Sequence, residues 1–358
     1  MRVERCSRSD PECCAVDETG EARSIARGNP SIQIALATFN SALFLRELLD
    51  SLLGQTFPDF TILVSDDGST DGTQALIAEY QEGHPGRIET LPGAPPGGPM
   101  QNFSRIVGAA SADYLFFCDH DDVWLPDKVA VTLRQMQALE ALHGRTMPLL
   151  VHTDLIVVGP NLAVRSPSMA KDRSAVSEMN GLGALLVNNS VTGCTTMVNR
   201  ALYRRAWPVP EAASMHDSWL ALVAAAVGRL HYINRPTILY RQHGGNFLGA
   251  PPRGGMWFIR RVLQALFQSK QGLRLERLSE QAEALLLRYA ADMSPAQREA
   301  TAALANLWSV NRWNRFRLLR RAGVRRWGPV RTIAFYIAVT KHRPRRRAAL
   351  LEAAQTHD

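Results

Sequence analysis

The chain has 358 residues, of which 46% are hydrophobic and 21% are charged, a composition typical of folded globular proteins and unlike that of disordered ones. The formal net charge of +8 is unevenly divided: residues 251–358 contain 21 Lys and Arg against 7 Asp and Glu, which leaves 20 basic and 26 acidic residues in 1–250. An acidic N-terminal part and a basic C-terminal part predict a polyanionic partner for the basic part, either an anionic membrane surface or nucleic acid.

The sequence features that indicate cellular location argue against a secreted protein and a membrane-spanning protein. Residues 1–30 have scattered charges and no apolar core, so they are not a secretory signal, and we expect a flexible tail. No run of about 18 apolar residues exists, so no membrane-spanning helix is expected. The five cysteines are an odd number without metal-ligand spacing, which indicates a reduced, cytoplasmic setting.

The first part of the chain alternates apolar runs of strand length with segments of helical periodicity. Strands are predicted at 32–37, 60–65, 88–91 and 114–118, and helices at 42–53, 73–82 and 100–110. This alternation predicts an α/β fold with a doubly wound, mostly parallel sheet flanked by helices. Ligands of such sheets bind beyond the carboxyl ends of the strands, and acidic strings at 66–71 and 119–122 follow two of them.

The remaining elements complete this sheet and add a basic region. Helices are predicted at 128–143 and 215–227, strands at 149–158, 182–188, 195–198, 230–233 and 237–240, and a loop at 159–180. After Pro251-Pro252, arginine-rich helices are predicted at 256–271, 273–291, 295–309 and 330–341. We therefore expect a tail over 1–30, one α/β domain over 31–250, and a basic, mainly helical C-terminal appendage over 251–358.

Two acidic strings carry the candidate chemistry. Asp119, Asp121 and Asp122 follow a buried strand and would repel one another unless a cation lay among them. Mg²⁺ suits such a place, because it takes one or two protein carboxylates and completes its shell with water and phosphate oxygens. In the string from Asp66 to Thr73, carboxylates can accept hydrogen bonds from a base or ribose, and glycines allow close approach. The alternatives are a solvated acidic turn and an Asx-rich helix cap.

Four motifs, jointly and in this order, resemble inverting family 2 glycosyltransferases with the GT-A fold. They are Thr38-Phe39-Asn40, the string from Asp66 to Thr73, Asp119-His120-Asp121 and His216-Asp217. The resemblance covers about residues 32–250. The longer strings are similar to the rhamnosyltransferase-like branch that acts in bacterial surface polysaccharide assembly: Cys118 to Trp124, Met215-His216-Asp217 and Tyr240-Arg241-Gln242-His243.

The resemblance implies a role for each matched position in donor binding. Asp67 would contact the nucleotide base, and Thr38 and Asn40 would line the same pocket. Asp119 would lie near the ribose, and Asp121 would bind the metal on the diphosphate.

The resemblance also bears on the remaining site residues. Asp217 would be the general base that takes the proton of the acceptor hydroxyl, with a helix-capping carboxylate as the alternative. Many relatives carry a glutamine–arginine–tryptophan motif where this chain has Arg241-Gln242-His243. Because of this departure the resemblance does not assign these two residues; from their chemistry, Arg241 would neutralise the diphosphate and His243 would be a metal ligand or a phosphate contact. A surface arginine and an ordinary loop histidine are the alternatives.

Together these features predict an inverting glycosyltransferase that depends on Mg²⁺ or Mn²⁺. Its donor would be a nucleotide-diphosphate sugar, with rhamnose as the first expectation, and its acceptor a lipid-linked or polysaccharide glycan. Single displacement needs a base on the acceptor and charge stabilisation on the leaving group. The alternatives are a sugar-nucleotide-forming nucleotidyltransferase, although residues 37–43 lack its glycine-rich basic loop, and a non-catalytic glycan- or polyanion-binding protein.

The basic tail suggests where the enzyme would work. Aromatic residues interleave with its arginines, as in amphipathic helices that lie on anionic membranes. We therefore expect peripheral attachment at the cytoplasmic face of the cell membrane. The alternative is a set of helices that only packs on the α/β domain. No nucleic-acid-binding module is recognised, so nucleic acid is not the expected partner.

Overall fold

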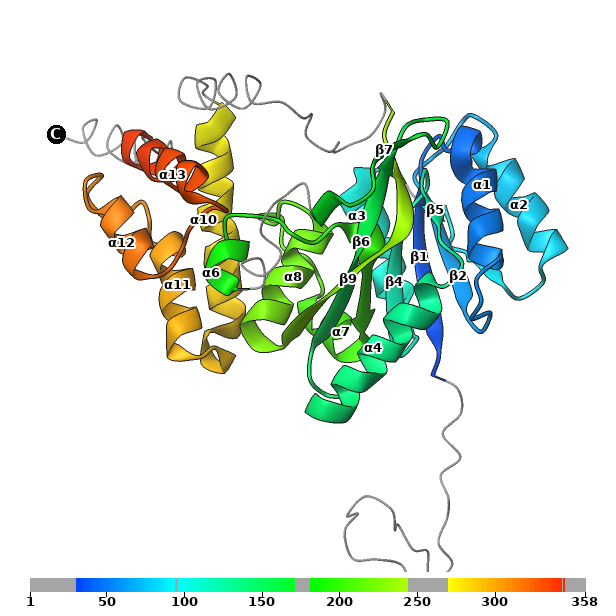
Figure 1. The fold of residues 1–358 in the computed structure, drawn as a ribbon, viewed down its shortest axis with the longest axis horizontal. Helices are drawn as coiled ribbons and strands as arrows, with labels where there is room; N and C mark the ends of the chain where they lie inside the picture. Colours follow the sequence, from blue (N-terminus) through cyan, green and yellow to red (C-terminus); the bar gives the residue numbers. More distant parts are fainter. Residues whose placement is uncertain (1–29, 94–95, 171–180, 244–269, 343, 345–358) are drawn as a thin grey trace, which may run out of the picture.

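A single mixed sheet forms the centre of the molecule (Figure 1). The computed structural model describes residues 30–93, 96–170, 181–243, 270–342 and 344. Within them the strand order is β3-β2-β1-β4-β8-β6-β9-β5, with β7 paired to β6. The strands are β1 (Ile32–Thr38), β2 (Thr61–Asp66), β3 (Ile88–Thr90), β4 (Tyr114–Asp119), β5 (Val123–Trp124), β6 (Leu149–Val158), β7 (Val164–Ser166), β8 (Thr196–Asn199) and β9 (Arg229–Arg241).

Strand direction follows from the pairings. β1 runs parallel to β2 and β4, β2 to β3, and β6 to β9. β8 is antiparallel to both β4 and β6, while β5 is antiparallel to β9 and β7 to β6. All strands except β5, β7 and β8 therefore point the same way, which confirms the predicted doubly wound, mostly parallel sheet. Their carboxyl ends lie along one edge, where ligands of such sheets bind.

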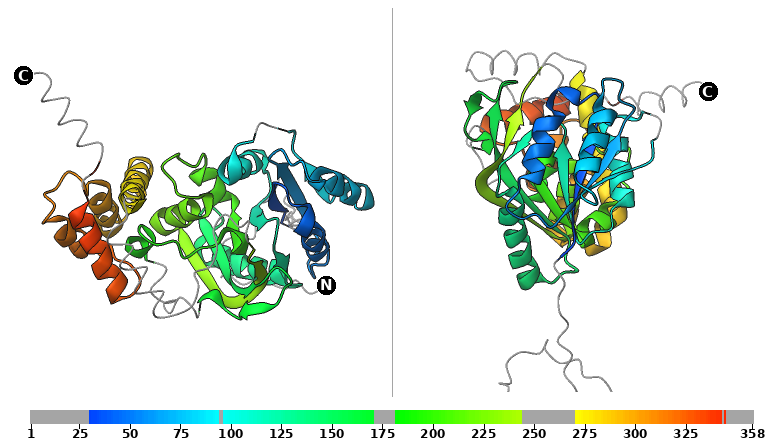
Figure 2. Two further views of the ribbon diagram at one scale, coloured as in Figure 1. Left: turned by 90° about the horizontal axis from the view of Figure 1, so that it is seen from above. Right: turned by 90° about the vertical axis from the view of Figure 1, so that its right-hand side faces the viewer.

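Helices cover both faces of the sheet and enclose two apolar cores (Figure 2). The helices before the C-terminal region are α1 (Ala42–Leu53), α2 (Thr73–Gly83), α3 (Gly98–Ala109), α4 (Lys128–His143), α6 (Leu182–Leu185), α7 (Arg200–Ala206) and α8 (His216–Val227). Phe116 packs in the core under α1, α2 and α4, whereas Phe117 packs in the core under α3, α7 and α8. Because β4 is apolar on both faces, it reads in the sequence as a continuous apolar run.

Two segments differ from their predicted form. The run predicted as a strand at 182–188 begins instead with the short helix α6, because apolar periodicity cannot separate short strands from buried helical turns. The strands predicted at 230–233 and 237–240 are one strand, β9, which continues through Pro236. The register against β6 shifts beside Asp154, so the missing N–H of the proline falls in irregular pairing.

The C-terminal helices pack on the α/β domain rather than standing apart. They are α10 (Lys270–Tyr289), α11 (Pro295–Ala305), α12 (Arg315–Arg321) and α13 (Pro329–Lys341). Leu285 of α10, Leu304 of α11 and Val339 of α13 are fully buried in the same core as Trp219 of α8. The predicted domain boundary at 250, the helix at 256–271 and nearly all of the tail at 1–30 lie outside the described residues.

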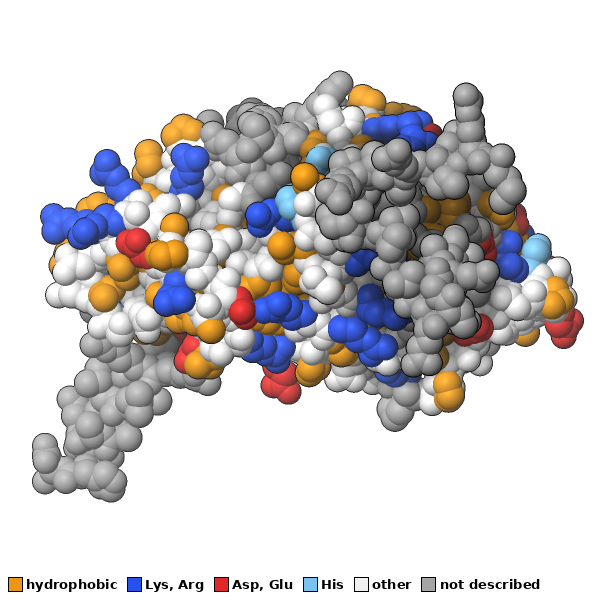
Figure 3. All heavy atoms as spheres, turned by 90° about the horizontal axis from the view of Figure 1, so that it is seen from below, with side chains coloured by type: hydrophobic (Ala, Val, Ile, Leu, Met, Phe, Trp, Pro, Cys, Tyr) orange, Lys and Arg blue, Asp and Glu red, His pale blue; other side chains and the backbone are white. Residues whose placement is uncertain are grey.

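Basic and apolar side chains share much of the surface. Figure 3 shows one face on which Lys and Arg side chains alternate with apolar ones and acidic side chains are sparse. None of the helices in the described part of the chain combines the length and the apolar composition needed to cross a bilayer.

Candidate active site

The parallel register brings the first acidic string to the end of the sheet. Thr38 pairs with Asp66 across β1 and β2, and Ala37 pairs with Asp119 across β1 and β4. The last residues of three neighbouring strands, β2, β1 and β4, therefore lie side by side. The sequence prediction that two distant carboxylate turns share one sheet edge is confirmed.

Thr38 and Asn40 hold the two loops of this edge together. The Thr38 hydroxyl donates to Asp66 Oδ1 over 2.8 Å. The Asn40 N–H donates to Ser69 Oγ over 2.8 Å, and Asn40 Oδ1 accepts from the Thr70 N–H over 2.9 Å. Asn40 has a φ of 47°, a left-handed conformation that asparagine tolerates better than most residues. Thr38 is buried and Asn40 is exposed, so only Asn40 presents open surface to a ligand.

Asp66 and Asp67 have different environments although they are neighbours. Burial alone would raise the pKa of Asp66, but hydrogen bonds from Ser69, Gln74 and Thr38 lower it below its usual value. Asp66 lines a cavity of about 480 Å³ beyond β2 and β3. The other lining residues are Gly68, Gln74, Ile77, Gln81, Thr90, Leu91 and Gly93.

Asp67, the residue expected at the nucleotide base, is buried and already hydrogen-bonded. Its carboxylate accepts N–H groups of Gly97 and Gly98 at the start of α3, at 3.0 and 2.8 Å. Arg105 of α3 adds an ion pair at 3.2 Å. Asp67 therefore fixes α3 against the end of β2, and a contact with a base would have to share these oxygens. The sequence reasoning missed Arg105, whose signal, a lone arginine in an amphipathic helix, carries no indication of its partner.

The second acidic string brings three carboxylates within electrostatic reach of one another. Burial, followed by the negative charges of Asp121 and Asp217, raises the pKa of Asp119 to about 7. Asp119 is the last residue of β4 and Asp121 lies in the turn that follows it, whereas Asp217 belongs to the first turn of α8. The structure thus places the predicted base beside the predicted diphosphate-binding pair.

Asp217 is held firmly at the start of α8. It is 9% exposed, and its oxygens accept the Gly193 N–H over 3.1 Å and the Asn189 Nδ2 over 3.3 Å. Its neighbour His216 is buried with its ring 4.2 Å from that of Phe103 and 5.1 Å from that of Phe117. Burial lowers the pKa of His216 to about 3, so this imidazole is neutral at physiological pH.

His243 contacts the other predicted metal ligand. Its Nε2 lies 2.9 Å from Asp121 Oδ2, and its ring packs 4.8 Å from the ring of Phe44. The contact joins the end of β9 to the turn after β4. The two residues predicted to bind a metal are therefore brought together by the structure.

Arg241 has a different place from the one expected. Its side chain is 1% exposed, and its guanidinium donates to the carbonyl oxygens of Asp121 and Pro160 and to the carboxylate of Glu47. The guanidinium also stacks 4.5 Å from the centre of the Phe44 ring. Arg241 therefore holds the acidic turn in place, and each of its three guanidinium nitrogens already donates a hydrogen bond within the protein.

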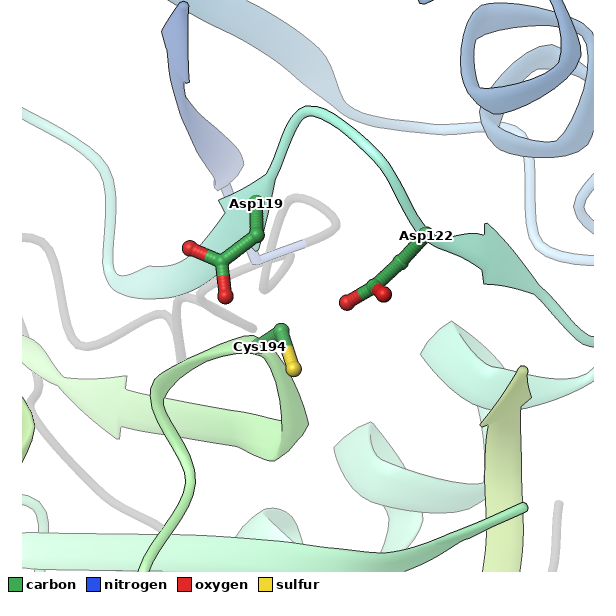
Figure 4. Close-up of side chains that lie close together, drawn as sticks. All are labelled: Asp119, Asp122 and Cys194. Carbon is green, nitrogen blue, oxygen red and sulfur yellow. The ribbon is translucent and has the colours of Figure 1, made fainter. Parts of the chain in front are cut away.

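Asp122 of the acidic string lies close to Cys194 and Lys128, two residues that were not among the site residues predicted from the sequence. Asp122 Oδ1 accepts the Arg241 N–H over 2.9 Å. Asp119, Asp122 and Cys194 have potential ligand atoms within 4.8 Å of one another (Figure 4). Lys128 is fully buried, its pKa lowered to about 8 by burial while nearby charges including that of Asp122 oppose the shift. This cation already acts on Asp122, and a thiol is a poor ligand for Mg²⁺, so we assign Asp122 and Cys194 to the support of the turn.

Residues 33–147 match the family model for glycosyl transferase family 2. This matched stretch is a family 2 glycosyltransferase domain. The matched range contains both acidic strings and ends before Asp217. The dTDP-rhamnosyl transferase RfbG of Shigella flexneri is 29% identical to this glycosyltransferase over 227 residues, 60% of this chain and 74% of the relative.

Two solved structures also align with this glycosyltransferase, both at low sequence identity. Staphylococcus aureus TarS 1–349 in complex with UDP-GlcNAc is 17% identical, with a TM-score of 0.47, over 87% of this chain and 90% of that one. The mannosyltransferase PcManGT from Pyrobaculum calidifontis, in complex with GDP-Man and Mn²⁺, is 17% identical, with a TM-score of 0.46, over 88% and 86%. The GT-A assignment rests on the family match and on the strand order described above.

Proposed function

We propose that this chain transfers a sugar, with inversion, from a nucleotide-diphosphate donor to a glycan acceptor. The observation that carries the proposal is the convergence of Asp121 and Asp217 on Asp119, whose carboxylate is affected by both of their charges at the sheet edge. One displacement forms the bond from the acceptor oxygen to the anomeric carbon and breaks the bond from that carbon to the diphosphate. The family match favours this reaction over the nucleotidyltransferase and non-catalytic alternatives.

Asp217 is the proposed base. The N–H of Gly193 and the amide of Asn189 orient its carboxylate and stabilise its charged form. As the acceptor oxygen attacks, the carboxylate takes the proton of that hydroxyl. A positioned base of this kind contributes about 10²–10⁴-fold to the rate.

Asp119, Asp121 and His243 are the proposed holders of a divalent cation. Two carboxylates and an imidazole suit Mg²⁺ or Mn²⁺. A positive charge would offset the burial and the neighbouring negative charges that raise the pKa of Asp119. Family 2 enzymes usually use a divalent metal. When bound, such an ion stabilises the negative charge on the departing diphosphate. Arg241 keeps the turn that carries Asp121 in position through its bond to the Asp121 carbonyl.

The proposed donor is a deoxythymidine-diphosphate rhamnose, because a relative that aligns with 60% of this chain is named for that activity. Asn40, Asp67 and Thr38 are the proposed neighbours of the nucleotide, at the ends of β1 and β2. The proposed acceptor is a lipid-linked or polysaccharide glycan at the inner face of a bacterial cell membrane, in surface glycan synthesis. The basic C-terminal helices support this setting.

The test is transfer by the purified full chain. Nucleotide sugars would first be screened by thermal shift with and without divalent cation, since a ligand that binds the folded state raises its apparent stability. The best donor would then be assayed for release of nucleoside diphosphate. We expect dTDP-rhamnose with Mg²⁺ or Mn²⁺ to give the largest shift and turnover.

A matched control separates loss of chemistry from loss of charge. Glu79→Gln removes a carboxylate from an exposed ion pair with Arg46 on α1 and α2, away from the acidic turn, and should leave turnover unchanged. Asp217→Asn should lower it at least a hundredfold. Full turnover in Asp217→Asn would show that the base lies elsewhere, and no donor shift with any nucleotide sugar would refute the proposed reaction.

A further inference from the structure

Helix α13 carries an apolar stripe on the side that faces away from the core. Phe335 and Val339 are buried against α10 and α12. On the opposite side, Val330, Ile333 and Ile337 are 53%, 59% and 38% exposed. Their spacing of three and four residues places these side chains on one face of the helix. This stripe is therefore a continuous apolar surface that the helix does not need for its own packing.

Positive charge surrounds the stripe. The sequence has no Asp or Glu between Glu299 and Glu352, while it has eight arginines and a lysine over residues 300–342 (Arg312, Arg315, Arg317, Arg320, Arg321, Arg325, Arg326, Arg331 and Lys341). Of these, Arg331 and Lys341 are exposed on α13 itself, one at each end of the stripe. The region is therefore cationic without any acidic side chain in its own sequence.

Electrostatic contacts show that these charges gather near α13. Burial and the nearby charges of Arg274 and Arg331 lower the pKa of Arg326 to about 9. The charges of Arg320 and Arg325 act on the hydroxyl of Tyr336 of α13. The fold therefore brings arginines from α10, α12 and the turn before α13 to the same helix, although like charges repel.

We propose that the α13 stripe and its surrounding arginines form a docking surface for an anionic phospholipid bilayer. Aliphatic side chains enter the boundary between headgroups and acyl chains, while arginines and lysine contact the lipid phosphates. Nucleic acid would attract the arginines but gives aliphatic side chains nothing to bury against. If a second copy of the chain docked on the stripe, the basic side chains around the two stripes would face and repel each other across the interface. The inference stands independently of the reaction proposed above.

Trp313 extends the surface at the far end of α13. It is 61% exposed, and it precedes Arg315, whose guanidinium donates to the carbonyl oxygens of Val339 and His342. These bonds tie the start of α12 to the end of α13. An exposed tryptophan beside a basic helix is typical of residues that lie at a membrane interface.

The test is sedimentation of the full chain with vesicles, without any sugar donor or acceptor. We expect binding to vesicles of phosphatidylcholine with phosphatidylglycerol, and little binding to phosphatidylcholine alone. Raising the salt from 0.1 to about 0.5 M should weaken binding, because exposed charges are then screened. Each basic residue at the surface contributes about fivefold to partitioning.

Two matched substitutions locate the surface. Ile333→Asp places a carboxylate in the centre of the stripe and should lower anionic-vesicle binding at least tenfold. Leu287→Asp makes the same change at another exposed side chain, which is 81% exposed and lies near the C-terminal end of α10. This substitution should leave binding unchanged. Both variants should melt within about 2 °C of the parent, since neither site is buried.

Four outcomes would overturn the proposal. They are failure to bind anionic vesicles, equal binding by Ile333→Asp and the parent, equal loss in both variants, and binding to RNA but not to vesicles. A dimer that dissociates on Ile333→Asp without any vesicle binding would identify the stripe as a contact between copies instead. Because no step involves sugar transfer, these results are independent of whether the proposed reaction is correct.

Discussion

Replacement of Arg241 distinguishes a structural role from a donor-binding role. Arg241→Gln removes guanidinium bonds to the Asp121 carbonyl, the Pro160 carbonyl and the Glu47 carboxylate, while its N–H bond to Asp122 remains. Hydrogen bonds made by charged groups are worth about 1.5–3 kcal/mol each when buried. The Glu47 side chain is 55% exposed, so its pair is worth about 1 kcal/mol or less.

The expected loss in the free energy of unfolding is therefore about 4 kcal/mol, within the range for breaking a buried charged network. With an unfolding entropy of about 2.1 cal/mol/K per residue, a chain of 358 residues should melt about 5 °C lower. Urea denaturation and calorimetry measure both quantities. Glu47→Gln is the control, because it removes only the half-exposed partner and should cost about 1 kcal/mol or less.

The expectation from the sequence is instead that the positive charge of Arg241 neutralises the diphosphate. In that case Arg241→Gln would keep its stability within about 1 kcal/mol of the parent and raise the KM for the donor. This combination would refute the structural reasoning. Loss of stability together with a modest change in KM would support it.

Three further predictions address the chemistry. Asp121→Asn and Asp217→Asn should each lower transfer at least a hundredfold while the melting temperature changes by about 2 °C or less; activity and melting curves are the measurements. Chelation by EDTA should abolish transfer and added Mg²⁺ or Mn²⁺ should restore it, whereas full activity in EDTA would contradict the assigned cation holders. The pKa of His216 is lowered to about 3 against about 6.5 when unfolded, so the unfolded state binds the extra proton and stability falls as pH drops through this window. His216→Phe, which keeps a ring against Phe103 and Phe117, should flatten that fall by up to about 1.4 kcal/mol per pH unit, measured by urea denaturation from pH 7 to 4.

The C-terminal helices show which structural features composition can predict and which it cannot. Their basic charge and helical periodicity are visible in the sequence, and the structure confirms α10, α11 and α13 close to the predicted ranges. Composition could not show that Leu285 and Leu304 enter the core beneath α8, nor that Ile333 faces outward. An amphipathic pattern states that a helix has an apolar side, but the partner of that side is decided by packing.

The sequence by itself determined the strand–helix units and the edge at which the acidic strings meet. These follow from local periodicity and from the rule that parallel strands end together. Only the tertiary structure decided that Asp67 is bonded to α3, that Arg241 is buried behind the turn, and that Asp217 lies beside Asp119. An aspartate or an arginine has the same one-letter code whether its side chain contacts a ligand or a neighbouring loop. Its role depends on groups a hundred residues away, which only the folded chain brings into contact.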